Sequence, residues 1–334
     1  MARSSELEIT RFLSLLRSAG PTKFVSGQTL AKRTGMSRSA VWKKIHRLRR
    51  YGYGIESVQG LGYRLVHNTQ LPVPWELKKL LKTKFIGKDV IYMDTAESTQ
   101  GVALDLASKK QEANGTVVIA NEQRNARGRL KRKWISPPGG LWFSVLLRPE
   151  IPTAAITLLP FVAALAVREA IVRITSLDAH VKWPNDVMIS ARKVAGILLD
   201  VSTEAEHVNY AVIGIGINAN IDESEIALKI VDTQGITSLK TELGREVDML
   251  GLLALILEKL EGYLDLLTRS GASAIISEWK NCTDMLGRRV VVSQNYATVH
   301  EGLAIDLLED GSLVVQAESG NEITVTSGDV RVRY

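Results

Sequence analysis

The chain has 334 residues, 45% of them hydrophobic and 23% charged, a composition typical of a globular protein with two or three domains. Its single cysteine, Cys282, excludes an intramolecular disulfide and a cysteine-based zinc cluster, and its five histidines show no metal-ligand spacing. The first ten residues contain no apolar core, so we expect no signal peptide. The longest apolar stretch, Ala154–Val167, is too short to cross a bilayer and is typical of a core helix. These features predict a cytoplasmic protein without a membrane partner.

The net charge of +6 is distributed unevenly along the chain. Residues 1–66 contain 13 Lys and Arg against three Glu, so this segment carries a balance of +10 and the remainder a balance of −4. A basic segment of this kind indicates an anionic partner for that segment alone.

The basic segment is predicted to form a winged helix-turn-helix domain over residues 1–67. Apolar residues at helical spacing predict a first helix over Leu7–Ser18. A short second helix and a third helix, from Arg38 to about Tyr51, follow around a glycine-containing turn, which is the helix-turn-helix pattern. Two alternating runs, Ile55–Val58 and Tyr63–Val66, then predict a β-hairpin, the wing.

The third helix has the features of a DNA recognition helix. Such a helix places its first residues at base edges and its basic residues at phosphates. The residues predicted to contact DNA are Ser37, Arg38, Ser39, Trp42 and Lys43. The alternative is a helical adaptor with a solvated basic face, which the balance of +10 disfavours.

A strongly basic loop lies near the middle of the chain. Residues 121–140, NEQRNARGRLKRKWISPPGG, join two apolar runs that we predict to be buried strands, Thr116–Ala120 and Leu141–Leu147. Six Lys and Arg lie between Arg124 and Lys133. A loop this basic is either solvated or wrapped around a negative ligand.

Several other polar positions have two interpretations when taken alone. Ser98–Thr99 lies at a strand-to-helix turn, where the side chains could simply cap the helix. Asp186 could be an ordinary turn residue, and Lys193 is either a surface lysine with a buried stem or a charge aimed into a site. The Gly-Ile-Gly at 214–216 suggests a dinucleotide fingerprint, but Ala219 replaces the third glycine. Glycines within a strand more often allow a flat ligand to approach the backbone.

Six ordered motifs together resemble the biotin protein ligase family. They are Glu97-Ser98-Thr99 with Gln123, Arg127-Gly128-Arg129, Arg132-Lys133-Trp134, Lys182-Trp183-Pro184-Asn185-Asp186, Lys193-Val194-Ala195-Gly196-Ile197-Leu198 and Gly214-Ile215-Gly216-Ile217-Asn218. With the winged helix in front, the chain resembles the bifunctional members that are both biotin ligase and biotin-operon repressor. The resemblance covers essentially the whole chain.

The resemblance implies an α+β fold of three domains. They are a winged helix-turn-helix at 1–67, a ligase core with a mixed sheet at 68–282, and an SH3-like small β-barrel at 283–334. The core would be related to those of class II aminoacyl-tRNA synthetases and lipoate ligases. The residues themselves predict a last helix at 272–279 and strands at 289–292, 303–308, 313–316 and 323–326.

The family's reaction has two steps. Biotin and ATP, with Mg²⁺, give biotinoyl-5′-AMP and pyrophosphate, and a lysine of a carboxylase carrier domain then takes the biotinyl group. The implied partners are a biotin carboxyl carrier protein domain and operator DNA, with the adenylate as corepressor of biotin synthesis genes and a homodimer as the adenylate-bound form. Because carboxylate and triphosphate repel each other, arginines around the phosphates suit this reaction.

The resemblance also implies roles for individual residues, and no protein-bound metal. The catalytic residues would be Lys193, Arg129 and Asp186. The biotin-binding residues would be Ser98, Thr99, Gln100, Gln123, Arg127, Gly128, Arg129 and Lys193. The residues that bind ATP and the adenylate would be Arg127, Arg129, Arg132, Trp134, Lys193 and Asn218.

Three positions depart from the family pattern. Ala126 and Lys131 stand where glycine is common, and we expect the loop to order differently because these residues lack the freedom of glycine at positive φ. Gln100 stands where asparagine is frequent, which is a small change in reach.

Three alternative functions remain open at the level of the sequence. A lipoate ligase shares the core fold, but the pattern from Arg127 to Trp134 and the winged helix disfavour it. A ligand-sensing repressor with an inactive core is disfavoured by the intact Asp186 and Lys193. The protein could also be a ligase whose winged helix no longer regulates anything.

Overall fold

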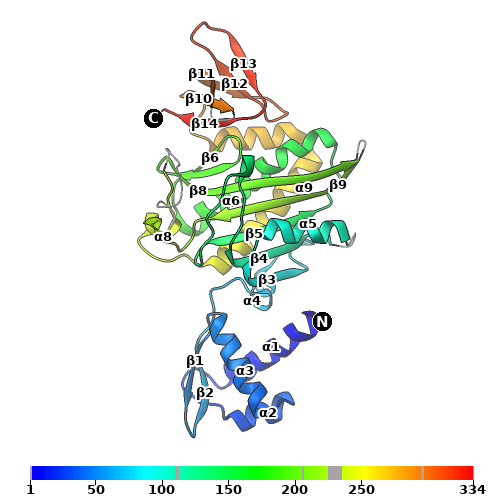
Figure 1. Cartoon of the computed structure of the whole chain (residues 1–334), viewed down its shortest axis with the longest axis vertical. Helices are drawn as coiled ribbons and strands as arrows, with labels where there is room; N and C mark the ends of the chain where they lie inside the picture. The colour runs from blue at the N-terminus through cyan, green and yellow to red at the C-terminus, as the bar shows by residue number, and fades with distance from the viewer. Residues whose placement is uncertain (1, 110–112, 205–206, 225–234, 295–296, 334) are drawn as a thin grey trace. The chain divides into compact units, whose positions relative to one another are not determined.

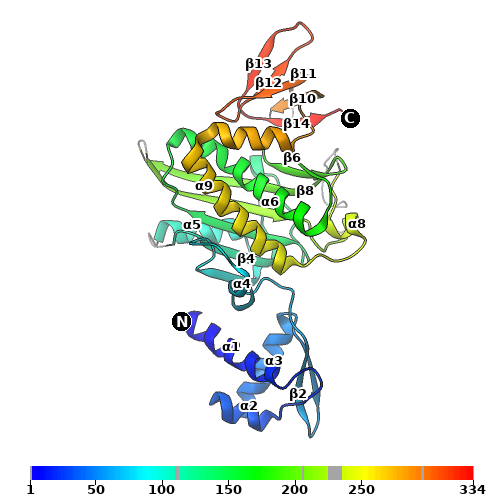
Figure 2. The same ribbon diagram turned by 180° about the vertical axis from the view of Figure 1, so that it is seen from behind.

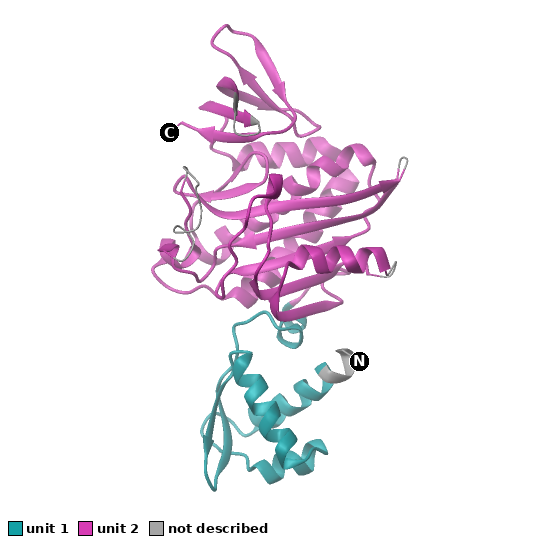
Figure 3. Ribbon diagram, viewed as in Figure 1, with its two compact units in different colours: residues 1–80 teal, residues 81–334 magenta. Residues whose placement is uncertain are grey.

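The computed structural model describes residues 2–109, 113–204, 207–224, 235–294 and 297–333. The chain divides into two compact units, residues 1–80 and 81–334 (Figure 3). The first unit extends beyond residue 67 because helix α4 (Pro74–Leu80) contacts helix α1 (Ala2–Ser18). A further division of the second unit near residue 282 stays a prediction.

The first unit is a winged helix-turn-helix, as predicted. After α1 come α2 (Gly27–Thr34) and α3 (Arg38–Arg50), and the antiparallel hairpin of β1 (Gly54–Val58) and β2 (Gly62–His67) forms the wing.

Short-range signals in the sequence set the helix ends of this unit. Ser26 and Ser37 cap α2 and α3 by accepting hydrogen bonds from backbone N–H groups three residues ahead, at 3.0 and 3.2 Å. Gly35 ends α2 in the left-handed conformation at a φ of 74°, which costs glycine little. The buried core is apolar and comprises Ile9, Phe12, Leu13, Leu16, Leu30, Val41, Ile45 and Leu48.

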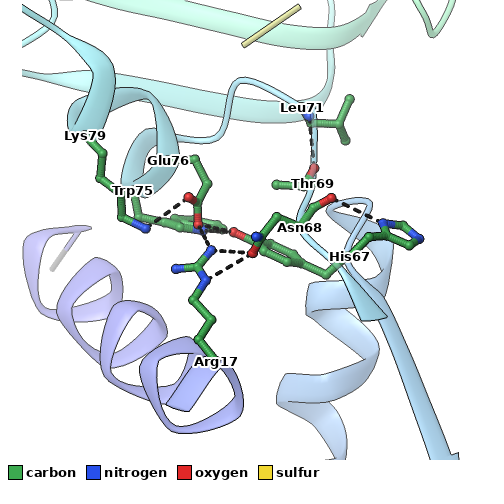
Figure 4. A network of polar contacts seen from close by, with 9 residues as sticks. Arg17, His67, Asn68, Thr69, Leu71, Trp75, Glu76 and Lys79 are labelled. Carbon is green, nitrogen blue, oxygen red and sulfur yellow. Dashed lines mark hydrogen bonds and ion pairs between the residues drawn. The ribbon is translucent and has the colours of Figure 1, made fainter. Parts of the chain in front are cut away.

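A buried polar network attaches α4 to this unit (Figure 4). The Glu76 carboxylate accepts hydrogen bonds from Arg17 at 2.7 Å and Tyr53 at 2.6 Å, and the Trp75 indole donates to the Tyr53 hydroxyl at 2.7 Å. Burial favours a raised pKa for Glu76, but the hydrogen bonds from Tyr53, Arg17 and Lys79 outweigh it and lower the pKa below its ordinary 4.5. The carboxylate is therefore held in its charged form inside the unit.

The second unit is built on a seven-stranded mixed sheet (Figure 1). Its strand order is β3-β4-β5-β9-β8-β7-β6, and β3 and β4 are parallel while the other pairs are antiparallel. The strands are β3 (Val90–Ala96), β4 (Thr116–Gln123), β5 (Leu141–Leu147), β6 (Ala179–Lys182), β7 (Asp186–Ile189), β8 (Arg192–Glu204) and β9 (His207–Ile217). The sheet confirms the mixed core and the two strands predicted on either side of the basic loop.

Helices cover both faces of this sheet, as Figures 1 and 2 show. Helix α5 (Thr99–Lys109) packs on β4, β5 and β9 through Ala103 and Ala107. Helices α6 (Leu159–Thr175) and α9 (Met249–Cys282) pack against each other over the opposite face. The 3₁₀-helix η2 (Thr153–Leu158) leads into α6, and the short α8 (Leu239–Leu243) precedes α9.

Helix α6, with η2 before it, confirms the predicted core helix. The helical stretch Thr153–Thr175 is long and apolar enough to cross a membrane by length and composition alone. The length of the apolar run Ala154–Val167 is therefore not enough to exclude a membrane span. However, 61% of its most apolar window is buried, and α6 contacts α9 and β8. These contacts are those of a core helix.

Helix α9 is much longer than the helix predicted at 272–279. It runs from Met249 to Cys282, the carboxylate of Asp248 caps its first turn, and it is interrupted at Gly271, where φ is 75°. Its buried leucines and isoleucines recur at helical spacing from Leu252 to Leu267.

The chain ends in a five-stranded antiparallel sheet with the order β13-β12-β11-β10-β14. The strands are β10 (Arg289–Gln294), β11 (Ala297–Leu307), β12 (Leu313–Gln316), β13 (Glu322–Val325) and β14 (Asp329–Val332). The four predicted strands are present, and β14 is an additional one.

Candidate functional site

A cavity of about 700 Å³ lies in the second unit, and every residue predicted for the ligase site lines it. These residues are Ser98, Thr99, Gln100, Gln123, Arg127, Gly128, Arg129, Arg132, Trp134, Asp186, Lys193 and Asn218. The sequence did not single out two further lining residues, Ser144 of β5 and Asp329 of β14. The motifs that are scattered along the chain therefore meet in one place.

The basic loop is closed by backbone hydrogen bonds. The Gly128 N–H donates to the Arg132 carbonyl at 2.8 Å, and the Trp134 N–H donates to the Ala126 carbonyl at 3.0 Å. Within it, Leu130 and Lys131 both adopt left-handed backbone conformations, with φ of 53° and 59°. Lys131 thus occupies a conformation that glycine would accept with less strain, whereas Ala126 does not have positive φ. The expected effect of losing glycine applies at Lys131 and not at Ala126.

Two arginines of the loop reach toward the C-terminal sheet. Arg132 forms an ion pair with Asp329, and Arg129 Nη1 lies 3.9 Å from the same carboxylate and donates to the Gly328 carbonyl at 3.2 Å. Arg129 Nη1 also donates to Asn185 Oδ1 at 3.1 Å. The carboxylate of Asp329 thus lies where an anionic ligand of these arginines would compete with it.

Lys193 is a charge aimed into the cavity. Its Nζ lies 2.6 Å from Asp186 Oδ1 and 5.2 Å from the centre of the Trp134 ring, and its side chain is 21% exposed. Asp186 Oδ1 has no directional hydrogen bond among the described residues, so the contact is one between charges. Asp186 begins β7 and pairs with Gly196 of β8, two residues beyond the partner of Lys193 in register, so opposite charges of neighbouring strands meet at one point of the cavity wall.

The glycines of β8 and β9 make room for a flat group. A Cβ added at Gly216 would lie 2.6 Å from Trp134 Nε1, and one at Gly196 would lie 3.1 Å from the same ring system. The indole of Trp134 therefore lies against two bare stretches of strand. This arrangement agrees with the interpretation of the glycines as positions where a flat group approaches the backbone closely.

A hydrogen-bonded polar group forms part of the cavity wall. The Gln123 Oε1 accepts from the Thr99 N–H at 2.8 Å and from the Thr99 hydroxyl at 3.1 Å, and Gln123 Nε2 donates to Ser136 Oγ at 3.1 Å. Ser98 precedes α5, and its Oγ accepts from the Gly101 N–H at 3.4 Å. Ser98 therefore lies at the N-terminal cap of α5, which is one of the two interpretations of the sequence. Thr99 instead belongs to the polar group around Gln123.

The five residues predicted to contact DNA are all exposed on α3 and its N-terminus. Trp42 is 54% exposed, and its ring centre lies 4.0 Å from that of His46. Other basic residues of this helix have structural partners. Lys44 forms an ion pair with Glu8 at 2.9 Å, and Arg49 donates to the Ile55 carbonyl at 2.8 Å. The structure thus distinguishes basic residues that hold the unit together from those presented to solvent.

No group of three or more His, Cys, Asp or Glu side chains that could hold a metal ion occurs among the described residues.

Comparison with known proteins agrees with this geometry. Residues 92–218 match the Biotin/lipoate A/B protein ligase family, and residues 9–64 match an HTH domain. The Bifunctional ligase/repressor BirA of Bacillus spizizenii is 34% identical over 310 residues, which are 92% of this chain and 94% of that relative. The chain belongs to the family of bifunctional biotin ligase/repressors.

Other relatives are also similar to this chain over most of its length. The Bifunctional ligase/repressor BirA of Escherichia coli is 30% identical over 327 residues, covering 95% of this chain and 98% of its own length. Among solved structures, biotin protein ligase from Aquifex aeolicus in complex with biotin and ATP has a TM-score of 0.61 at 28% identity. It covers 74% of this chain and 99% of its own.

Proposed function

We propose that this chain is an ATP-dependent biotin protein ligase, a biotin–[acetyl-CoA-carboxylase] ligase, and also a DNA-binding transcriptional repressor. One observation carries the proposal: one cavity is lined both by arginines with Lys193 and by a hydrogen-bonded polar group around Gln123. A ligand with a carboxylate and a polar head suits such a cavity, and ATP supplies the phosphates for the basic end. Relatives with this domain combination are named for both activities.

In the first step, a biotin carboxylate oxygen attacks the α-phosphorus of ATP, and the bond to the bridging oxygen breaks to release pyrophosphate. Arg127, Arg129 and Arg132 offset the repulsion between the two anions and the charge that builds up on the phosphate. Lys193 contacts the same oxygens, and Trp134 and Asn218 serve the adenine. The product is biotinoyl-5′-AMP.

In the second step, the amine of a carrier-domain lysine attacks the acyl carbon and AMP leaves. Asp186, beside Lys193, is the carboxylate placed to take the proton that the amine loses. Mg²⁺ prefers oxygen ligands and is held largely by substrate phosphates, which suits a site with few carboxylates, and it neutralises phosphate charge. Asp186, whose carboxylate lines the cavity, would add a protein oxygen to the metal ion.

The repressor activity rests on the exposed face of α3. We infer that the adenylate acts as corepressor of biotin synthesis genes, that the adenylate-bound form is a cytoplasmic homodimer, and that it binds a two-fold operator. Linkage requires the adenylate to bind the dimeric form more tightly than the monomer. We also infer that the core is related to class II aminoacyl-tRNA synthetases, and that the C-terminal sheet is an SH3-like barrel that closes over ATP and docks the carrier domain.

The ligase proposal is tested by transfer to a carrier domain. Purified full-length chain is incubated with ATP, Mg²⁺, biotin and a biotin carboxyl carrier domain, and attached biotin is detected by mass. We expect attachment that depends on ATP and on the carrier's lysine. Attachment of lipoate in place of biotin would contradict the assignment.

The DNA proposal is tested with the double variant Arg38→Ala/Lys43→Ala. Because both side chains are exposed at the start of the recognition helix, we expect loss of binding to operator DNA and a salt slope smaller by about two. The variant Lys82→Ala/Lys88→Ala removes the same charge from exposed positions of other segments and serves as the control. Unchanged affinity in the first variant, with helical content intact, would refute the interface.

A further inference from the structure

Lys193 lies at a point where strand β8 changes its neighbour. The register pairing of β8 with β9 ends at Ala195, and a short segment, residues 235–237, forms a parallel bridge to Lys193 beyond that point. The Lys193 N–H donates to the Gly235 carbonyl at 3.3 Å, and the Thr237 N–H donates to the Lys193 carbonyl at 3.0 Å. Both backbone polar groups of Lys193 therefore bond to segment 235–237.

The side chain of Thr237 attaches this segment to two carboxylates. Thr237 is fully buried, and its Oγ1 lies 2.6 Å from Glu242 Oε1 and 2.9 Å from Glu223 Oε1. A threonine hydroxyl has one proton, so Thr237 can donate to only one of the two carboxylates. The two negative charges therefore converge on one hydroxyl group and would repel each other without a cation beside them.

Arg192 supplies that cation. Its Nη1 donates to Glu223 Oε1 at 2.7 Å, and its Nη2 donates to Glu242 Oε1 at 2.6 Å. The planar fork of arginine allows one side chain to hold both carboxylates through separate nitrogen atoms. The Glu242 side chain is 11% exposed, against 32% for Glu223, so water and salt screen the pair with Glu242 less.

This ion-paired cluster lies behind the wall of the cavity. The four side chains of the cluster do not line the cavity, and they are those of Arg192, Glu223, Thr237 and Glu242. Lys193, which follows Arg192 in the chain, does line it, and so does Asn218, whose Nδ2 donates to the Thr237 carbonyl at 3.0 Å. An effect of the cluster on the reaction therefore passes through the residues that the cluster holds in place.

We propose that Arg192 is a positioning residue of the ligase, which fixes segment 235–237 and thereby the backbone from which Lys193 reaches the reacting oxygens. This inference rests on the proposed function, because it concerns the residue that the proposed reaction places at the carboxylate and the α-phosphate. A shift of about 1 Å in such a residue can reduce a reaction rate by about a hundredfold.

The test is a double-mutant cycle on the full-length chain. The rate constant for the first turnover of biotin-dependent pyrophosphate release is measured for the wild type, Arg192→Met, Lys193→Ala and the double variant. Biotin and ATP are saturating, so that a change in nucleotide binding through Asn218 does not enter the comparison. Arg173→Met is the control, because it removes an arginine from an ion pair with Glu169 on α6.

We expect Arg192→Met to lower this rate constant about tenfold or more, because the ammonium group of Lys193 is no longer held at the reacting oxygens. In the Lys193→Ala background, the same substitution should change the rate constant less than about twofold, because no ammonium group is left to position. The control should change it in neither background.

An equal factor in both backgrounds would overturn the proposal, because a purely structural role of Arg192 lowers the rate whether or not Lys193 is present. An unchanged rate in Arg192→Met would overturn it as well. Should Arg192→Met not fold, Thr237→Val takes its place in the cycle, and the effect must again depend on Lys193 for the proposal to stand. Absence of biotin-dependent release by the wild type would overturn the ligase function itself, whereas an active wild type with equal factors removes only the role of Arg192.

Discussion

Lys193 is the residue on which the proposed chemistry depends most. Its ammonium group lies 2.6 Å from a carboxylate and 5.2 Å from the centre of an aromatic ring, at the wall of the cavity. Before a ligand enters, the charge of Lys193 is thus held in place by Asp186 and Trp134. A group positioned in this way needs little reorganisation when negative charge develops beside it.

Removing Lys193 or Arg129 should abolish most adenylate formation. We expect Lys193→Ala and Arg129→Ala each to reduce biotin-dependent pyrophosphate release by about a hundredfold or more, since each variant loses a charge aimed at the phosphate. Lys88→Ala, at an exposed position of the same unit, should retain full activity. Near-normal release in the two cavity variants would show that the reacting groups lie elsewhere.

The charged residues in the motifs were predicted from the sequence, but the buried serine of the cavity, Ser144, was not. Taken alone, Lys193 and Asp186 each had two interpretations. The resemblance to a family was needed to assign both residues to one site. Ser144 lies in the apolar run LWFSVLL, so periodicity hides it within a strand. The available signal is chemical: a polar side chain inside a buried strand must find a partner.

Between elements, an ion pair joins β14 to the basic loop. Arg132 contacts the Asp329 carboxylate, and Arg129 lies 3.9 Å from it. Both side chains are partly exposed, so each pair contributes little to stability. In the proposed site, however, the carboxylate would compete with ATP for the same guanidinium groups.

Neutralising Asp329 should therefore favour the nucleotide. We expect Asp329→Asn to lower the KM for ATP about two- to fivefold, the range that corresponds to a partly exposed ion pair. Glu318→Gln is the matched control, because Glu318 pairs with Arg289 in the same sheet and does not line the cavity. An increased KM in Asp329→Asn would mean that the carboxylate orders the loop for ATP instead of competing with it.

The position of helix α4 in the first unit depends on a buried carboxylate, that of Glu76. Glu76 joins Arg17 of α1 to Tyr53, and Trp75 donates to that tyrosine. Because its side chain is 10% exposed, the hydrogen bonds to it are poorly replaced by water.

Replacing this carboxylate should loosen the unit in a pH-dependent way. We expect Glu76→Gln to destabilise α1 and α4 by about 1–2 kcal/mol at neutral pH, measured by amide hydrogen exchange of the full chain. The folded-state pKa of Glu76 lies below 4.5, so its stabilisation is complete above that pH and is lost as the pH falls through the folded value. The difference from the wild type should therefore shrink in acid.

The variant Glu8→Gln provides the comparison for this prediction. Glu8 pairs with Lys44, but its side chain is 49% exposed, so the expected effect is below about 0.5 kcal/mol. Equal exchange rates in Glu76→Gln and the wild type at neutral pH would contradict the role of the network.

Elements whose ends carry strong local signals were predicted, whereas the first part of α9 and strand β14 were not. The caps of α2 and α3 and the wing follow from polar residues and glycines at fixed positions. The first part of α9 was missed although its leucines repeat at helical spacing, and the glycine at 271 interrupts the pattern. Strand β14 is four residues long and close to the end of the chain, and strands this short carry little periodic signal.

For the whole molecule, the uneven charge along the sequence correctly indicated that its two parts carry different functional features. The excess of basic residues falls in the first unit, which carries the exposed recognition helix, and the second unit carries the cavity. What the sequence could not give is the contact between α1 and α4, because it joins residues far apart in the chain through polar side chains. The first unit therefore continues past the predicted boundary at residue 67 to residue 80.

The most direct test of the central claim is pyrophosphate release from ATP and Mg²⁺ by the purified full-length chain, without DNA or carrier domain. The account predicts release that requires biotin and that lipoate does not support. Biotin binding without any release would contradict it and would leave a ligand-sensing repressor.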